Sequence, residues 1–167
     1  MRFTYCPDCG SRLVPRPIGD EGLVPYCESC KKPLFELFST CIIVMVVNEY
    51  EEVALLKQGY LSSVYWVLVS GYMKPGESAE ECTRREVQEE IGLELEQLQI
   101  VGTDWFARRE QLMIGFIARA KKREFTLSGE VEEARWVPVE EAPGLMHPGK
   151  SISAELVRRY LKGRGKA

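Results

Sequence analysis

The sequence predicts an α+β fold in which several strands and two helices share one core, preceded by a small cysteine-rich module. Three observations carry this prediction. Short apolar runs recur along the chain, one acidic segment has the start and stop signals of a helix, and cysteines lie in two pairs near the first residues. At 167 residues and 45% hydrophobic content, the chain can bury one good core beside a small module held by a metal.

The strands are predicted from runs of apolar residues. The run from Cys41 to Val47 reads CIIVMVV without polar alternation, which is typical of a strand covered on both faces. A terminal helix is expected from Ser151 to Leu161, where Ile152, Leu156 and Tyr160 recur at helical spacing. Further strands are expected at Val53 to Leu56, Val64 to Val69, Leu112 to Ala118 and Ala134 to Val139.

Composition argues against several classes of protein. No apolar run is long enough to span a bilayer, and the formal net charge of -3 gives no general reason to expect nucleic acid or an anionic membrane as partner. The chain starts MRFTYCPDCG with no apolar signal segment, so we expect a location in the cytoplasm. The boundary between the two parts is placed near Pro33, which divides the chain into residues 1–35 and 36–167.

The acidic segment carries clear helix signals. Ser78 followed three residues later by Glu81 has the pattern of a capping box, and Gly92 is a residue that commonly ends helices. We therefore predict a helix from Ala79 to Ile91.

Three carboxylates should project from one side of this helix. Glu86, Glu89 and Glu90 are three and four positions apart, so they share a face, while Val87 and Ile91 can pack elsewhere. Like charges this close repel one another unless a cation neutralises them. Mg2+ or Mn2+ fits such a site because these ions prefer oxygen ligands. The alternative is a solvated acidic helix face with no ligand.

Two further residues complete the candidate catalytic set. Arg85 lies beside the three carboxylates and can hold one of them by a forked, charge-assisted pair. Glu77, in the loop that enters the helix, can join the metal shell or tie the loop to the helix.

The cysteine pairs predict a second metal site. Cys6 and Cys9 form one C-x2-C pair and Cys27 and Cys30 another, a spacing typical of a tetrathiolate zinc ribbon. Four thiolates close the coordination shell of Zn2+, so the site is expected to be structural. Two disulfides are the alternative, which a reducing compartment disfavours.

The stretch from Gly71 to Leu93 fits the pattern G-x5-E-x7-R-E-U-x-E-E-x-G-U, in which U is aliphatic, and this pattern resembles the Nudix box. The resemblance implies an α/β/α sandwich around a mixed sheet. It also implies metal-dependent hydrolysis of a nucleoside diphosphate linked to another moiety. Which carboxylate acts as general base is left open, because family members differ on this point.

A zinc ribbon directly before a Nudix domain resembles the NADH pyrophosphatase branch of the family, as does the LMIGF segment that starts at Leu112. Glu130 opens a segment similar to the branch's E-x-x-E-A-R-W, in which the first glutamate joins the metal site. Tyr72 stands where the branch has an aromatic residue that stacks on a base. Ser153 falls in a helix similar to P-x-x-S-I-A-x-x-L-I, and a homodimer is implied as well.

Two departures from the branch concern the substrate. TDWFARREQ, from Thr103 to Gln111, stands in place of the branch's SQPWPFPxS, and Lys74 replaces an acidic or small residue. Arg108 and Arg109 can bind a phosphate of the substrate, or form a solvated basic surface. NADH, NAD, ADP-ribose and FAD are therefore all candidate substrates.

A protein of another class is the alternative to an enzyme. A regulatory protein would sense a nucleotide with the Nudix fold and hold nucleic acid or a partner with the ribbon. The basic ribbon residues permit contact with RNA, including capped RNA; they are Arg12, Arg16, Lys31 and Lys32. The complete glutamate set favours the enzyme, because a pure sensor does not need every catalytic acid.

Overall fold

The computed structural model describes residues 3–59, 62–149 and 151–164. The chain divides into two compact units, Met1–Phe38 and Ser39–Ala167. This division lies a few residues after the point where the sequence places the boundary. No helix in the described part of the chain combines the length and apolar character needed to cross a membrane.

The smaller unit is a three-stranded antiparallel sheet. Its strands are β1 (Val14–Pro17), β2 (Leu23–Cys27) and β3 (Lys32–Pro33), in the order β1-β2-β3. Among the described residues of this unit, the buried apolar side chains that are not cysteines are Leu13, Val24 and Leu34. A core this small gives little hydrophobic stabilisation, which is why units of this size usually depend on a metal or disulfides.

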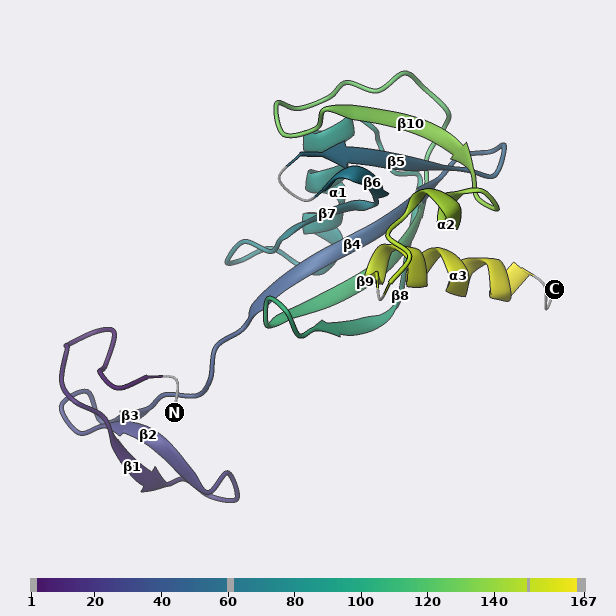
Figure 1. Cartoon of the computed structure of the whole chain (residues 1–167). Coiled ribbons are helices and arrows are strands. Elements are labelled where there is room, and N and C mark those ends of the chain that lie inside the picture. Colours follow the sequence, from purple (N-terminus) through teal and green to yellow (C-terminus); the bar gives the residue numbers. More distant parts are fainter. Residues whose placement is uncertain (1–2, 60–61, 150, 165–167) are drawn as a thin grey trace. The chain divides into compact units, whose positions relative to one another are not determined.

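The larger unit is built on a mixed sheet whose main path runs β10-β5-β4-β9-β8 (Figure 1). The central strand β4 runs parallel to β9 and antiparallel to β7, while β6 pairs with β5. The strands are β4 (Ser39–Val47), β5 (Glu52–Gln58), β6 (Ser62–Val67), β7 (Val69–Tyr72), β8 (Gln97–Phe106), β9 (Gln111–Arg119) and β10 (Glu133–Pro138).

Helices cover both faces of this sheet. On β4, Ile42 and Val44 pack with α1 (Ala79–Ile91), whereas Ile43 and Met45 pack with the side of α2 (Ala142–Leu145) and α3 (Ile152–Arg164). Figure 1 shows this arrangement, with α1 on one face and the other two helices on the opposite face. The α/β/α sandwich and the fully buried β4 are thus confirmed, because every residue of β4 from Cys41 onward is buried.

Two strand predictions need correction. The run from Val64 to Val69 was expected as one strand, but the ladder breaks at Leu68, so that β6 pairs with β5 and β7 with β4. Strand β8 was not expected, because it lies at the sheet edge and alternates polar and apolar residues irregularly around a bulge at Gly102. The Ala79–Ile91 helix has the predicted bounds.

Candidate active site and cysteine cluster

Helix α1 is fixed at both ends by local hydrogen bonds. Ser78 Oγ accepts from the Glu81 N–H at 3.2 Å, and Glu81 Oε2 accepts from the Ser78 N–H at 2.7 Å, which is the predicted capping box. Gly92 adopts a left-handed conformation with φ 70°, and its N–H donates to the Gln88 carbonyl. These caps fix the limits of the helix.

A cleft of about 860 Å3 opens beside this acidic face. Glu86, Glu89 and Glu90 line it from α1, and Glu130 lines it from the loop before β10. The four carboxylates that the sequence nominates for a divalent ion therefore share one cavity. The opposite wall comes from β7, β9 and neighbouring residues, among them Gly71, Tyr72, Arg109 and Gln111.

Arg85 pairs with three carboxylates at once. Its Nε and Nη2 donate to the two oxygens of Glu77 at 3.0 and 2.8 Å, which is a forked pair between helix and loop. Its Nη1 donates to Glu86 Oε1 at 2.6 Å and to Glu89 Oε2 at 3.0 Å. Hydrogen bonding to Arg85 lowers the pKa of Glu77 to about 2, and pairing with Glu77 raises the pKa of Arg85. Arg85 is thus a fixed cation that orients the acidic side chains.

Glu90 is the most buried carboxylate of the cluster, at 5% exposure. Its Oε1 accepts from Gln58 Nε2 at 2.9 Å, while its Oε2 has no hydrogen-bond partner among the described residues. Burial raises the pKa of Glu90 to about 7; the Gln58 hydrogen bond opposes this rise, and the charges of Glu86, Glu130 and Glu89 add to it. A buried oxygen without a donor, among other carboxylates, fits a divalent cation that offsets the charge.

Gly71 leaves the space that Glu86 occupies. A Cβ added at Gly71 would overlap the Glu86 carboxylate. Burial raises the pKa of Glu86, and its pairing with Arg85 opposes the rise. Because Gly71 has no side chain, β7 can lie close to the acidic face of α1 without a clash with Glu86.

An aromatic ring and a cation also line the cleft. Tyr72 ends β7 with 55% of its surface exposed, and its hydroxyl accepts a hydrogen bond from Gln111 Nε2 at 2.6 Å. Arg109 lines the cleft from the turn between β8 and β9, a turn that the TDWFARREQ segment helps to form. Lys74 also lines the cleft, with its Nζ 4.0 Å from Glu89 Oε1.

Two residues nominated for substrate binding lie away from this lining. Arg108 is exposed on the turn beside Arg109 but is not among the described residues that form the cleft. Ser153 is buried in the first turn of α3, which covers the opposite face of the sheet from α1.

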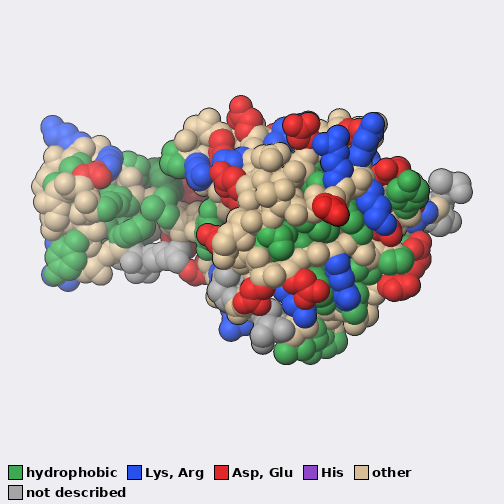
Figure 2. All heavy atoms as spheres, turned by 90° about the horizontal axis from the view of Figure 1, so that it is seen from above, with side chains coloured by type: hydrophobic (Ala, Val, Ile, Leu, Met, Phe, Trp, Pro, Cys, Tyr) green, Lys and Arg blue, Asp and Glu red, His purple; other side chains and the backbone are tan. Residues whose placement is uncertain are grey.

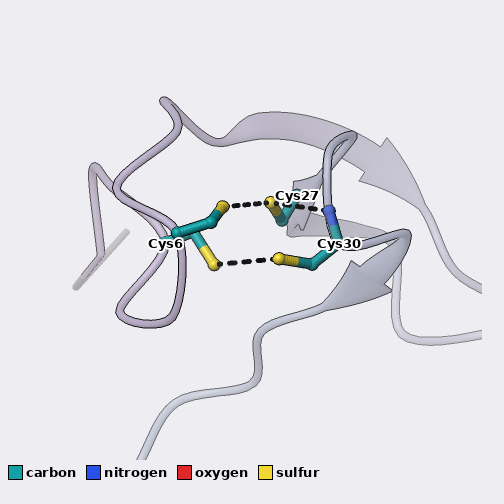
Figure 3. Close-up of side chains that lie close together, drawn as sticks. Cys6, Cys27 and Cys30 are labelled. Atoms are coloured by element: carbon teal, nitrogen blue, oxygen red, sulfur yellow. Dashed lines mark hydrogen bonds between the residues drawn. The ribbon is translucent and has the colours of Figure 1, made fainter.

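The four cysteines of the smaller unit converge, and Figure 3 shows the side chains of Cys6, Cys27 and Cys30 turned toward one another. The Sγ atoms of Cys6, Cys9, Cys27 and Cys30 all lie within 4.8 Å of one another, and all four thiols are free. Sγ distances are 3.9 Å for Cys6 to Cys30 and 3.5 Å for Cys9 to Cys27. Sulfurs bound to Zn2+ at about 2.3 Å in a tetrahedron lie roughly 3.8 Å apart, so the spacing fits a tetrathiolate metal site.

Sequence reasoning missed two buried glutamines at this site. Gln58, on β5, contacts Glu90, and Gln111, at the start of β9, contacts Tyr72. Alternation along β5 was the available signal, because Ala54, Leu56 and Gln58 follow one another at every second position.

Comparisons with known proteins agree with this fold. The NUDIX domain family matches residues 38–160. The chain is 33% identical to the NAD-capped RNA hydrolase NudC of Pseudomonas entomophila (strain L48), and 34% identical to the protein of the same name from Pseudomonas putida (strain W619). Each match covers 96% of this chain but 56% of the relative, so the chain spans little more than half the length of these relatives.

Solved structures share the fold at low sequence identity. A NUDIX hydrolase from Nitrosomonas europaea aligns over 99% of this chain and 94% of its own, with a TM-score of 0.74 and 19% identity. The NUDIX domain of Shewanella oneidensis NrtR, solved with ADP ribose, aligns over 81% of this chain and 94% of its own, with a TM-score of 0.63 and 15% identity. Because the family match covers well over half of its residues, the chain belongs to the NUDIX family.

Proposed function

We propose that this chain hydrolyses the pyrophosphate bond of a nucleoside diphosphate linked to another moiety, with NADH, NAD, ADP-ribose and FAD as candidate substrates. The cleft beside α1 carries this proposal, because it combines four carboxylates with an exposed aromatic ring, Tyr72, and a cation, Arg109. Relatives named as hydrolases of NAD-capped RNA support the same chemistry.

The carboxylates of the cleft would hold the metal. Glu86, Glu89, Glu90 and Glu130 are the proposed ligands, and the unpaired Oε2 of Glu90 supports the assignment. A divalent ion bound there, Mg2+ or Mn2+, would offset the charge of the diphosphate and activate a water for attack on phosphorus.

The chain's own residues would prepare this chemistry. Arg85 keeps Glu77, Glu86 and Glu89 in fixed positions, so little reorganisation is needed when the substrate binds. The glutamates that line the cleft are the candidates to accept the proton of the attacking water.

The aromatic ring and the cations of the cleft would recognise the nucleotide. Stacking of a base on Tyr72 is worth about 1 to 3 kcal/mol in nucleic-acid systems and tolerates many bases. Arg109 would bind a phosphate, and Lys74 adds a second cation to the cleft. Arg108 and Ser153 stay predictions as substrate contacts, which a structure with bound nucleotide would test.

Selectivity among the candidates should be low. The proline-rich segment of the branch is replaced by a short β8–β9 turn, so recognition of the second half of a dinucleotide should be weak. We expect less than tenfold discrimination between NADH and ADP-ribose in kcat/KM, a gap of under about 1.4 kcal/mol. A preference of a hundredfold for NADH would contradict this interpretation of the TDWFARREQ segment.

A hydrolysis screen tests the proposal. The chain would be incubated with dinucleotides, nucleotide sugars, nucleoside triphosphates and capped RNA in Mg2+ or Mn2+, and the products identified by mass. Binding of nucleotides without turnover of any of them would instead favour a sensing or regulatory protein.

We further propose that residues 1–35 form a structural zinc ribbon and residues 36–167 the hydrolase domain. Cys6, Cys9, Cys27 and Cys30 would hold Zn2+, since their free thiols and mutual spacing fit it. Free thiols also suit the reducing cytoplasm, which we propose as the location. Metal analysis of the purified protein tests the zinc assignment.

Two partner assignments belong to the same proposal. Capped RNA is proposed as a substrate because the small unit exposes basic side chains, which are Arg12, Arg16, Lys31 and Lys32. On the face of the larger unit that Figure 2 shows, acidic and basic side chains are interspersed. Among its described residues, this face has no continuous basic surface that would bind the phosphates of an RNA chain. The homodimer stays a prediction, which light scattering in solution checks.

A further inference from the structure

The buried residue Gln58 is unexplained by packing alone. It continues the face of β5 that carries Ala54 and Leu56, both of which pack with α1. An apolar side chain would suit this position, because burying a primary amide costs free energy unless its polar atoms are hydrogen-bonded. Gln58 is nevertheless 1% exposed.

One hydrogen bond connects Gln58 to the acidic cluster. Its Nε2 donates to Glu90 Oε1 at 2.9 Å. This hydrogen bond joins β5 to α1, two elements that are far apart in the sequence. Gln58 Oε1 and Glu90 Oε2 are the described buried side-chain oxygens or nitrogens without a partner. The two side chains therefore share one hydrogen bond, and each keeps one buried oxygen without a donor. Mutual hydrogen bonding alone does not explain why a glutamine is buried here.

The pairing of β5 with its neighbour β6 is irregular at this point. The ladder between β5 and β6 shifts register between Leu56 and Gln58. Between these two pairs β5 advances by two residues and β6 by five, so the extra residues lie on β6, while β5 keeps its regular pairing with β10 as far as Lys57. Gln58 therefore lies on the regular strand beside this irregularity, and it is the residue that contacts Glu90.

We propose that Gln58 is a positioning residue for Glu90, an inference that rests on the proposed metal-dependent function. By donating to Oε1, the Gln58 amide fixes the carboxylate and leaves Oε2 as the oxygen that binds the divalent ion. Gln58 does not line the cleft, so it acts only through Glu90. Partners of this kind, which orient a metal ligand, typically change metal affinity or activity by about 10- to 100-fold when they are removed.

The test measures Mn2+ binding without substrate, by the loss of the free Mn2+ signal in electron paramagnetic resonance, on the zinc-loaded full chain. Gln58→Met keeps the size of the side chain and removes the donor, and Gln58→Glu replaces the donor by a second carboxylate. We expect the Mn2+ affinity to fall at least tenfold in both, and the Mg2+ concentration for half-maximal activity to rise by a similar factor.

A comparison with Glu90 and with the second buried glutamine separates positioning from general packing. In a Glu90→Gln background, Gln58→Met should change Mn2+ affinity less than twofold, because the charged carboxylate that Gln58 orients is gone. Gln111→Leu, which removes the hydrogen bond to Tyr72 and not one to a proposed metal ligand, should raise KM and change Mn2+ affinity less than twofold.

The outcomes separate this inference from the proposed function. If wild type binds no Mn2+ and hydrolyses no nucleotide, both the proposed function and the inference that rests on it are refuted. If wild type binds and hydrolyses while the Gln58 variants keep wild-type affinity, only the inference fails. If neither Gln58 variant folds, Gln58 is a structural residue, and the inference is equally overturned.

Discussion

Replacing Glu90 by glutamine should stabilise the metal-free protein while removing its activity. Burial holds the pKa of Glu90 at about 7, against an ordinary 4.5, so the fold carries a penalty for the ionised carboxylate. The difference corresponds to about 3 kcal/mol at pH 8, at about 1.4 kcal/mol per pKa unit. Glu90→Gln removes the charge, keeps the shape and supplies an NH2 donor beside Gln58, whose Oε1 lacks one.

The sign depends on pH in a defined way. A carboxyl group whose pKa is raised in the fold contributes its full stability below the unfolded value, near 4.5, and loses it as the pH rises through about 7. The gain from Glu90→Gln should therefore be about 3 kcal/mol at pH 8 and less than about 1 kcal/mol at pH 5. At about 2 to 4 °C per kcal/mol, Tm should rise by about 6 to 12 °C at pH 8.

Thermal denaturation of wild type and variant, at pH 5 and pH 8 without added divalent ions, measures both values. Glu89→Gln is the matched control on the same helix, since its side chain is 53% exposed and should gain far less. Nucleotide hydrolysis by Glu90→Gln should fall by about two orders of magnitude or more. An unchanged or lower Tm at pH 8 would refute the burial argument.

Four further predictions concern Glu89, Glu77, Tyr72 and the cysteine cluster. Glu89→Gln should lower turnover by about a hundredfold or more while the fold survives, as kcat and circular dichroism report; activity near wild type in both Glu89→Gln and Glu90→Gln would remove the metal-centre assignment. Cys27→Ser should reduce the zinc content, measured by elemental analysis, from about one per chain without abolishing hydrolysis; a wild type that holds no zinc and whose thiol titration shows these cysteines in disulfides would contradict the assignment. Tyr72→Ala should raise KM for every adenine substrate, and a kinetic screen showing no change would exclude stacking there. Because Arg85 lowers the pKa of Glu77 to about 2, the stability from Glu77 is present above pH 4.5 and lost as the pH falls toward 2; Glu77→Gln should flatten the acid part of the Tm curve, and an unaltered curve would exclude the pair.

The sequence predicted α1 and its acidic face because the signals there are local. Ser78 and Gly92 act on the helix through neighbouring backbone groups, and Glu86, Glu89 and Glu90 share a face by helical geometry alone. The same holds for the cysteine pairs, whose C-x2-C spacing predicts that the four thiols come together, as they do in the structure.

Long-range contacts could not be predicted in this way. Gln58 and Glu90 meet only after β5 packs against α1, and Gln111 reaches Tyr72 only because β4 lies between β7 and β9 in the sheet. The break at Leu68 likewise follows from the choice of strand partners rather than from the residues of the run. Of the two arginines in the turn between β8 and β9, Arg109 lines the cleft and Arg108 is not among the described lining residues, a difference that the sequence does not distinguish.

The most direct test of the account is product analysis by mass spectrometry. Wild type and Glu89→Gln would be incubated with NAD, NADH and ADP-ribose in Mg2+, using water labelled with oxygen-18. We predict that wild type splits each compound at its pyrophosphate into two monophosphate products, one of them carrying the label, and that the variant does so at least about a hundredfold more slowly. Equal rates in the two proteins, or no cleavage of any nucleotide by metal-loaded wild type, would contradict the claim that the acidic face of α1 is a hydrolytic metal centre.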